Sequence, residues 1–139
     1  MAYILLITIF AVVLSIGLHY TALLFTTIIL GHFHGTHPAS IVLALFLAVI
    51  AHLLEIFIFA VAWYVMFSMH LITFSISSPN FLDLLYFSGT TYTTIGYGDI
   101  YITGDGRIMT VVEGVMGLVL IAWTASFTYY EMNRKWIRQ

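Results

Sequence analysis

The chain has 139 residues, of which 62% are hydrophobic and only 7% are charged. Charged residues make up about a quarter of a typical soluble domain, so this composition excludes a soluble fold and indicates a membrane protein. The chain has no cysteine, which excludes disulfides and thiolate metal sites, and its net charge of −2 is too small to indicate a nucleic-acid partner.

Three long apolar runs lie along the chain, at residues 2–30, 41–69 and 108–130. Each run exceeds the ~20 residues that a helix needs to cross a bilayer. The first run lacks a preceding basic segment and a small-residue cleavage site, and it is longer than the core of a signal peptide. We therefore predict an all-α membrane protein that keeps an additional N-terminal transmembrane helix at residues 1–30.

The segment 31–40 between the first two runs is rich in histidine. It contains His32, His34 and His37 in the sequence His-Phe-His-Gly-Thr-His. This spacing is compatible with binding of a transition metal or with sensing of protons near neutrality. Solvated loop histidines without either role are the plainer interpretation.

Two more histidines and a glutamate lie inside the first two runs, where ionisable groups are costly and usually have a partner. His19 lies 11 residues before Leu30, and His52 lies 11 residues after Ile41. In two antiparallel helices both lie ~16 Å from the connecting loop. Glu55 follows His52 on the same helical face.

We therefore predict that His19, His52 and Glu55 form a buried polar cluster that holds the first helix to the rest of the chain and responds to pH. The alternative is that one histidine only hydrogen-bonds a backbone carbonyl or a hydroxyl such as that of Thr21. Glu113, in the third run, is a further ionisable residue inside a predicted helix.

A shorter element lies between the second and third runs. Residues 81–92 correspond to ~18 Å of helix, which can enter a bilayer partway and is too short to cross it. Ser78 is expected as the N-cap and Pro79 as the first helical residue, where the missing N–H costs nothing. Asp83 then lies favourably near the positive end of the helix dipole. We predict a re-entrant helix at residues 79–92.

Residues 93–99 have the sequence Thr-Thr-Ile-Gly-Tyr-Gly-Asp. Their carbonyl oxygens, with the Thr94 hydroxyl, can replace the water around a potassium ion if they all point the same way. That arrangement needs alternating right- and left-handed backbone conformations, and Gly96 and Gly98 adopt the left-handed one without a Cβ clash. Irregular backbone is tolerated inside a membrane only where protein buries it.

Residues 94–99 resemble the selectivity filter of the tetrameric potassium-channel family, and the resemblance covers residues 81–126. It implies a homotetramer in which each chain supplies a quarter of a ring of oxygens around potassium ions. The implied ion-binding residues are Thr94, Ile95, Gly96, Tyr97 and Gly98, and the implied supporting residues are Thr93, Asp99 and Tyr86. Ile95 stands where the family more often has valine.

Two aromatic residues of the predicted re-entrant helix differ from the family pattern. Tyr86 stands where many members have tryptophan, and we expect its hydroxyl to hydrogen-bond the Asp99 carboxylate. Phe87 stands where others have a second polar aromatic residue, and it cannot hydrogen-bond Tyr97. The loss of this tether favours slow closure of the outer filter; the alternative is that Phe87 simply packs.

The segment 107–131 resembles the inner helix of the family, which lines the cavity and gates the channel. Gly117 aligns with a bending glycine, so Gly114 and Gly117 are a candidate hinge, but small residues in membrane helices also allow close packing. Both interpretations remain open. The predicted cavity wall is one helical stripe, formed by Leu118, Ile121 and Ala125.

The basic residues predict the orientation. Arg134, Lys135 and Arg138 follow the third run, so the positive-inside rule places the C-terminus and the segment 31–40 in the cytoplasm and the N-terminus outside. The first two runs contain no lysine or arginine, so we expect no voltage sensor.

We therefore predict a potassium-selective channel of the plasma membrane, with a pore domain at residues 41–139 that conducts passively. We expect no enzymatic chemistry and no organic cofactor; the partners are K⁺, lipid and three further copies of the chain. The alternatives are a weakly selective cation channel or a channel subunit that needs a partner. A membrane metalloprotein that uses the histidines is more remote, because it would not explain residues 94–99.

Overall fold

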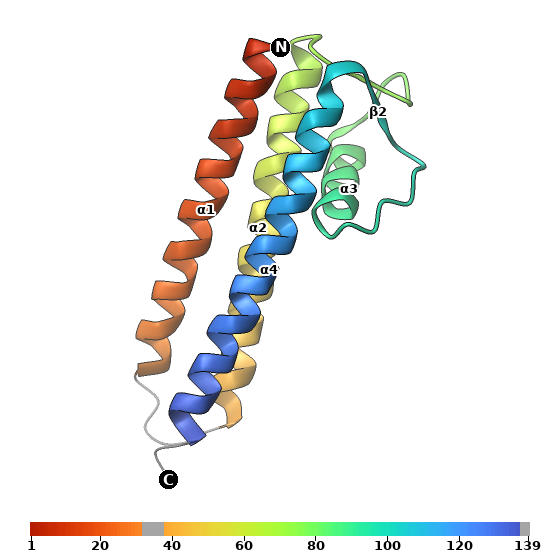
Figure 1. The fold of residues 1–139 in the computed structure, drawn as a ribbon. Helices are drawn as coiled ribbons and strands as arrows, with labels where there is room; N and C mark the ends of the chain where they lie inside the picture. The colour runs from red at the N-terminus through yellow and green to blue at the C-terminus, as the bar shows by residue number, and fades with distance from the viewer. Residues whose placement is uncertain (32–37, 137–139) are drawn as a thin grey trace.

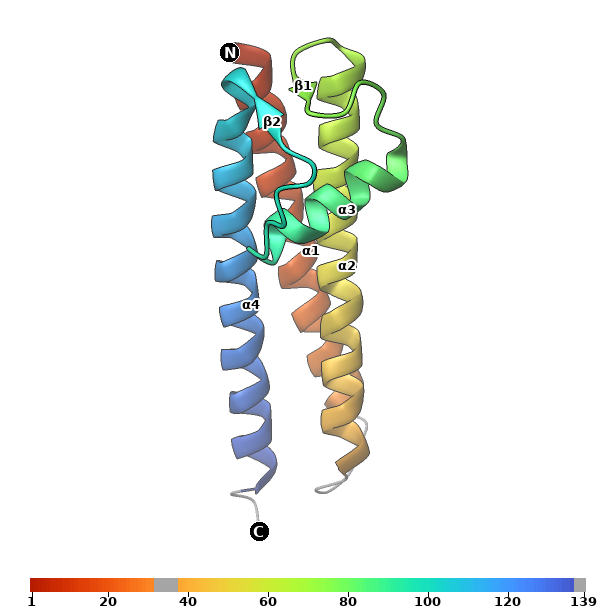
Figure 2. The ribbon, with the colours of Figure 1, turned by 90° about the vertical axis from the view of Figure 1, so that its right-hand side faces the viewer.

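A computed structural model describes residues 1–31 and 38–136. Its helices are α1 (Ala2–Gly31), α2 (Pro38–Ser68), α3 (Phe81–Tyr92) and α4 (Arg107–Trp136). The helices α1, α2 and α4 run side by side, and the short α3 lies against one half of the bundle (Figure 1). After a turn of 90° about the vertical, α3 crosses in front of α2 and ends beside α4, while α1 lies behind (Figure 2). The histidines at 32, 34 and 37 lie outside the described residues.

The predicted all-α membrane architecture is confirmed. Three of the described helical segments are long and apolar enough to cross a membrane, and they cover Ala2–Gly31, Ala39–Ser68 and Gly104–Arg134. The helix α2 begins earlier than the predicted residue 41, and α4 continues past the predicted end at residue 131. The apolar runs underestimated the lengths of both helices, because a spanning helix continues into the polar interface beyond the hydrocarbon core.

The predicted start of the re-entrant helix was wrong. The N-cap of α3 is Asn80 and not Ser78, and Pro79 lies before the helix. The Asn80 side chain accepts hydrogen bonds from the backbone N–H of Leu82 at 2.8 Å and of Asp83 at 3.1 Å. The Asp83 carboxylate in turn accepts from the Asn80 backbone N–H at 2.8 Å. This reciprocal capping box satisfies more orphan N–H groups than a serine two residues earlier would.

A two-stranded ribbon that was not predicted joins the two ends of the re-entrant segment. The strands β1 (Thr73–Phe74) and β2 (Ile102–Thr103) pair antiparallel, and η1 (Gly104–Gly106) follows as a single turn of 3-10 helix. The Thr73 and Thr103 hydroxyl oxygens lie 2.8 Å apart, and the Ser75 backbone N–H donates to the Tyr101 carbonyl at 2.8 Å. The ribbon therefore fastens the chain entering α3 to the chain leaving residues 93–99.

The glycines of α4 face the C-terminal end of α3. A Cβ atom on Gly117 would lie 1.9 Å from the Tyr92 carbonyl oxygen, whereas one on Gly114 would lie 3.5 Å from the Thr91 carbonyl oxygen. The helix α4 is unbroken at both positions. Gly117 therefore allows the close approach of two backbones, which accords with the packing interpretation, and the hinge stays a prediction.

We expect Gly117→Ala to lower the free energy of unfolding by about 1–3 kcal/mol, because its Cβ overlaps the Tyr92 backbone. Gly114→Ala in the same helix is the matched control. Its Cβ makes an ordinary contact, and alanine favours the helix by up to about 1 kcal/mol. Chemical unfolding in detergent micelles measures both variants. Equal stabilities of the two proteins would contradict the close approach of α3 and α4.

Candidate functional site

The backbone after α3 alternates between two conformations. The φ angles are +60° at Thr94, +52° at Gly96 and +81° at Gly98, so every second residue is left-handed. The two glycines adopt the conformation predicted for them. Thr94 adopts it without being a glycine, which requires the surrounding structure to hold it there. An alternation of this kind is the backbone conformation that the predicted row of carbonyl groups at residues 94–98 requires.

The amides of this segment bond back to the end of α3. The Thr94 N–H donates to the Thr91 carbonyl at 2.9 Å, and the Gly96 N–H donates to the Thr90 carbonyl at 3.1 Å. Within residues 1–31 and 38–136, no hydrogen bond ends on the carbonyl oxygens of residues 94–98. The segment therefore uses its donors for anchorage and leaves a row of acceptors open to a cation.

Side chains of the segment stand at the surface of the single chain. Ile95 is 57% exposed and Tyr97 is 69% exposed. The Tyr97 ring stacks parallel to the Tyr86 ring, with centroids 6.4 Å apart and an interplanar angle of 3°. The nearby Asp99 carboxylate raises the pKa of the Tyr86 hydroxyl above its ordinary value. Tyr86 therefore lies close to Tyr97 and Asp99, and its role in supporting the filter stays a prediction.

Phe87 points away from this segment. It is buried, and its ring centroid lies 5.3 Å from that of Trp63 and 5.4 Å from that of Phe74. The packing interpretation of Phe87 is therefore the one that fits the structure. Phe87 has no group that could hydrogen-bond Tyr97, whichever way it packs. Slow closure of the outer filter therefore stays a prediction.

A buried carboxyl group lies behind α3. The Glu113 carboxyl of α4 accepts hydrogen bonds from Trp63 Nε1 at 2.7 Å and from Ser88 Oγ at 2.5 Å. Ser88 Oγ also lies 2.8 Å from the Ile56 carbonyl oxygen. These contacts join α2, α3 and α4 around one fully buried side chain. The sequence signal for it was an ionisable residue inside a spanning helix; its partners were not predicted.

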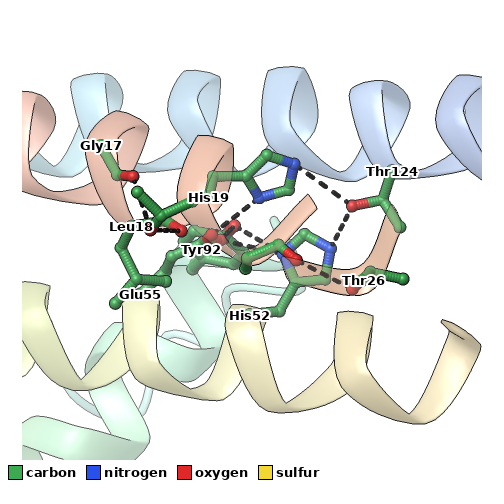
Figure 3. A network of polar contacts seen from close by, with 10 residues as sticks. Gly17, Leu18, His19, Thr26, His52, Glu55, Tyr92 and Thr124 are labelled. Carbon is green, nitrogen blue, oxygen red and sulfur yellow. Dashed lines mark hydrogen bonds and ion pairs between the residues drawn. The ribbon is translucent and has the colours of Figure 1, made fainter. Parts of the chain in front are cut away.

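The structure brings together His19, His52 and Glu55. His19 Nδ1 lies 2.8 Å from Glu55 Oε1, and His52 Nδ1 lies 2.9 Å from Glu55 Oε2 (Figure 3). The two imidazole centroids are 5.5 Å apart. The predicted contacts between α1 and α2 are present, and the response to pH stays a prediction.

Two further residues, which the sequence analysis missed, complete this cluster. The Tyr92 hydroxyl of α3 donates to Glu55 Oε2. The Thr124 hydroxyl of α4 lies 3.0 Å from His52 Nε2 and 3.4 Å from His19 Nε2. The buried cluster, as we call these residues from here on, consists of His19, His52, Glu55, Tyr92 and Thr124. It joins all four helices, and Tyr92 directly precedes residues 93–99.

The predicted cavity wall lies on the outer face of α4. Leu118, Ile121 and Ala125 are all exposed in the single chain. They do not belong to the intrachain core, so this face is available to line a space between subunits. Their role in a cavity stays a prediction.

A comparison with known protein families matches residues 51–130 to an ion channel family. The chain belongs to this family. The matched region includes most of α2, all of α3 and most of α4, and it leaves α1 outside. The protein is thus an ion channel with three membrane-spanning helices, in which His19 of α1 contacts the family domain through Glu55.

One curated relative of this ion channel is Protein LctB of Geobacillus stearothermophilus. It is 34% identical over 53 residues, which are 38% of this chain and 40% of LctB. The match therefore spans about two fifths of that relative. No solved structure matches the chain.

We expect Tyr92→Phe to lower the free energy of unfolding of the channel by about 1–3 kcal/mol, because it removes a donor to the buried Glu55 carboxylate. Tyr64→Phe is the control, since this hydroxyl lies on a side chain that is 49% exposed. Chemical unfolding of both variants in micelles provides the measurement. A loss of the same size in the control would show that the Tyr92 hydroxyl has no special contact.

Proposed function

We propose that this ion channel is a homotetrameric, potassium-selective channel that conducts passively through residues 94–98. The observation that carries this proposal is the left-handed conformation at every second residue, combined with carbonyl oxygens that accept no hydrogen bond among the described residues. Such oxygens can replace the hydration shell of K⁺, which carries a single charge and loses its water readily to carbonyl dipoles. Thr94 adds its hydroxyl to the stack.

The tetramer follows from the requirements of the membrane. One chain presents only part of a ring around an ion, and its residues 93–99 are exposed. Irregular backbone at membrane depth must be buried by protein or line an aqueous path. Four copies around an axis satisfy both requirements and aim the negative ends of four α3 helices at one central cavity.

The orientation and the gating are part of the same proposal. Arg134, Lys135 and Arg138, at the C-terminal end of the sequence, support a plasma-membrane orientation with the end of α4 on the cytoplasmic side and the N-terminus outside. The sequences of α1 and α2 contain no lysine or arginine along their whole length. Neither helix can therefore act as a voltage sensor, so gating responds to small ions, protons, lipid, tension or a partner protein.

A weakly selective cation channel is the second candidate, and one observation favours it. The side chain of Phe87 lies in the aromatic core with Trp63 and provides no hydrogen bond to Tyr97. A filter with fewer tethers deforms more easily and discriminates less between cations of similar size.

Tracer flux into liposomes that contain the purified protein tests the proposal. We expect liposomes loaded with K⁺ to take up external ⁸⁶Rb⁺, because the outward K⁺ gradient drives the uptake through a potassium-selective pore. Excess external K⁺ should compete with this uptake, and Na⁺ should not. Equal competition by Na⁺ would establish the second candidate. Absence of flux from a correctly folded tetramer would contradict a self-sufficient channel and indicate a subunit that needs a partner.

Gly96→Ala should abolish potassium selectivity or conduction. The backbone at Gly96 has a φ of +52°, and an L-residue there costs about 1–2 kcal/mol in each chain. Gly17→Ala is the control, because a Cβ on Gly17 has no neighbour within 4 Å. Bilayer recordings measure the permeability ratio of K⁺ to Na⁺. A wild-type ratio in the Gly96→Ala channel would show that residues 94–98 are not the filter.

Open probability should depend only weakly on voltage. Each charge that crosses the field contributes ~2.3 kcal/mol per 100 mV, and the sequence of α1 and α2 contains no lysine or arginine to supply a ladder of such charges. Macroscopic currents recorded over a range of voltages, without blocking ions, provide the measurement. A steep conductance–voltage curve equivalent to several gating charges is the contrary outcome.

A further inference from the structure

The buried cluster contains donor atoms that converge on one point. A ring nitrogen of His19, a ring nitrogen of His52 and a carboxylate oxygen of Glu55 all lie within 4.8 Å of one another. His19 is 1% exposed and Glu55 is 0% exposed, so water does not solvate these groups. Two imidazoles and one carboxylate form a common ligand set for transition metals.

The hydrogens available in the buried cluster do not suffice for its contacts. Glu55 meets His19, His52 and Tyr92, and Thr124 meets both imidazoles, which makes five contacts. Two neutral imidazoles, one phenol and one hydroxyl carry one polar hydrogen each, so four hydrogens must serve five contacts. A sixth approach, between His52 Nδ1 and the Tyr92 oxygen at 2.9 Å, adds no hydrogen.

The shortage has two resolutions. With an N–H on each Nδ1, three hydrogens serve Glu55, the Thr124 hydroxyl serves His52 Nε2, and only the 3.4 Å contact to His19 Nε2 goes unserved. The other resolution places both N–H groups on Nε2. The Thr124 hydroxyl can accept two hydrogen bonds but can donate only one. If both rings donate to Thr124 from Nε2, the lone pairs on both Nδ1 atoms face the Glu55 carboxylate. These lone pairs and the carboxylate repel one another unless a cation lies between them. The ionised carboxylate also gives the buried cluster a net charge that an apolar interior does not tolerate unpaired.

We propose that His19, His52 and Glu55 form a binding site for a zinc-class divalent metal ion at the junction of the helices. The ligands are the two Nδ1 atoms and the Glu55 carboxylate, with the Tyr92 oxygen as the fourth. Thr124 accepts an N–H from each imidazole and so holds the lone pairs toward the ion, as partners of metal-bound histidines do. The positive ion offsets the charge of the buried Glu55 carboxylate.

The distances require only a small adjustment. Zinc bonds of about 2.0–2.1 Å in a tetrahedron place ligand atoms about 3.3 Å apart. His19 Nδ1 lies 2.8 Å from Glu55 Oε1 and His52 Nδ1 lies 2.9 Å from Oε2, so each of these pairs separates by about half an ångström. The Tyr92 oxygen lies closer to Oε2 and moves further, and the carboxylate rotates to present one oxygen to the ion. His52 is 18% exposed and borders a hollow that Ile121, Thr124 and Ala125 also line, which provides an entry path.

The site would link α1 to the proposed filter. Tyr92 is the last residue of α3, and the next residue begins the segment 93–99. An ion bound by His19, Glu55 and Tyr92 therefore ties α1, α2 and α3 together at the base of this segment. The inference does not depend on potassium selectivity, because metal binding is measured without ion flux.

Cobalt(II) titration of the full-length protein in micelles tests the site. The background protein carries His32→Gln, His34→Gln and His37→Gln, so that the segment 31–40 does not bind the metal. We expect one Co²⁺ per chain with the intense visible bands of tetrahedral coordination, displaced by Zn²⁺. In this background, His19→Gln or Glu55→Gln should abolish the bands, and the control His70→Gln should leave them unchanged.

Thr124→Ala keeps every ligand and removes only the acceptor for the imidazole N–H groups. It should weaken Zn²⁺ binding by about 10- to 100-fold. Zinc-edge X-ray absorption of the background protein requires no further variant, and it should show imidazole nitrogen bound to zinc. A background protein that takes up no Co²⁺, one whose zinc is bound by water alone, or unchanged binding in His19→Gln would overturn the site. In that case a proton on one of the two imidazoles, in place of a metal ion, would balance the Glu55 carboxylate.

Discussion

The close contact between the end of α3 and Gly117 of α4 determines where everything else in this channel lies. The Tyr92 carbonyl approaches the α4 backbone so closely that no side chain fits between them. This approach fixes the point at which the irregular segment begins. The last carbonyls of α3 then receive the amides of Thr94 and Gly96, which leaves the carbonyls of that segment free. A backbone inside a membrane has no water to satisfy it, so an internal anchorage of this kind is required.

Buried polar side chains hold the helices around that contact. Between membrane helices the hydrophobic effect gives little specificity, because lipid is as apolar as the side chains, and packing and hydrogen bonds take its place. Glu113 joins three helices through Trp63 and Ser88. Glu55 of α2 contacts His19 of α1, His52 of α2 and Tyr92 of α3. Two carboxyl groups thus position the short helix that carries the candidate filter.

The elements that could be predicted are those with a local physical signal. Length and apolarity identified the three spanning helices, and the glycine spacing indicated a left-handed backbone at Gly96 and Gly98. The N-cap was misjudged because Ser78-Pro79 and Asn80 with Asp83 are both plausible starts, and only the reciprocal bonds distinguish them. The β1–β2 ribbon has two residues in each strand, which is too short for any periodicity to be visible.

The sequence by itself determined the spanning helices, the pattern of residues 94–99 and the equal depth of His19 and His52, because each follows from spacing along one chain. Only the tertiary structure decided that Tyr92 and Thr124 join the buried cluster and that Gly117 is a packing contact. Spacing along the chain gives the depth of a residue and its face relative to its own helix. It does not give the rotation of one helix against another, and that rotation decides which side chains meet.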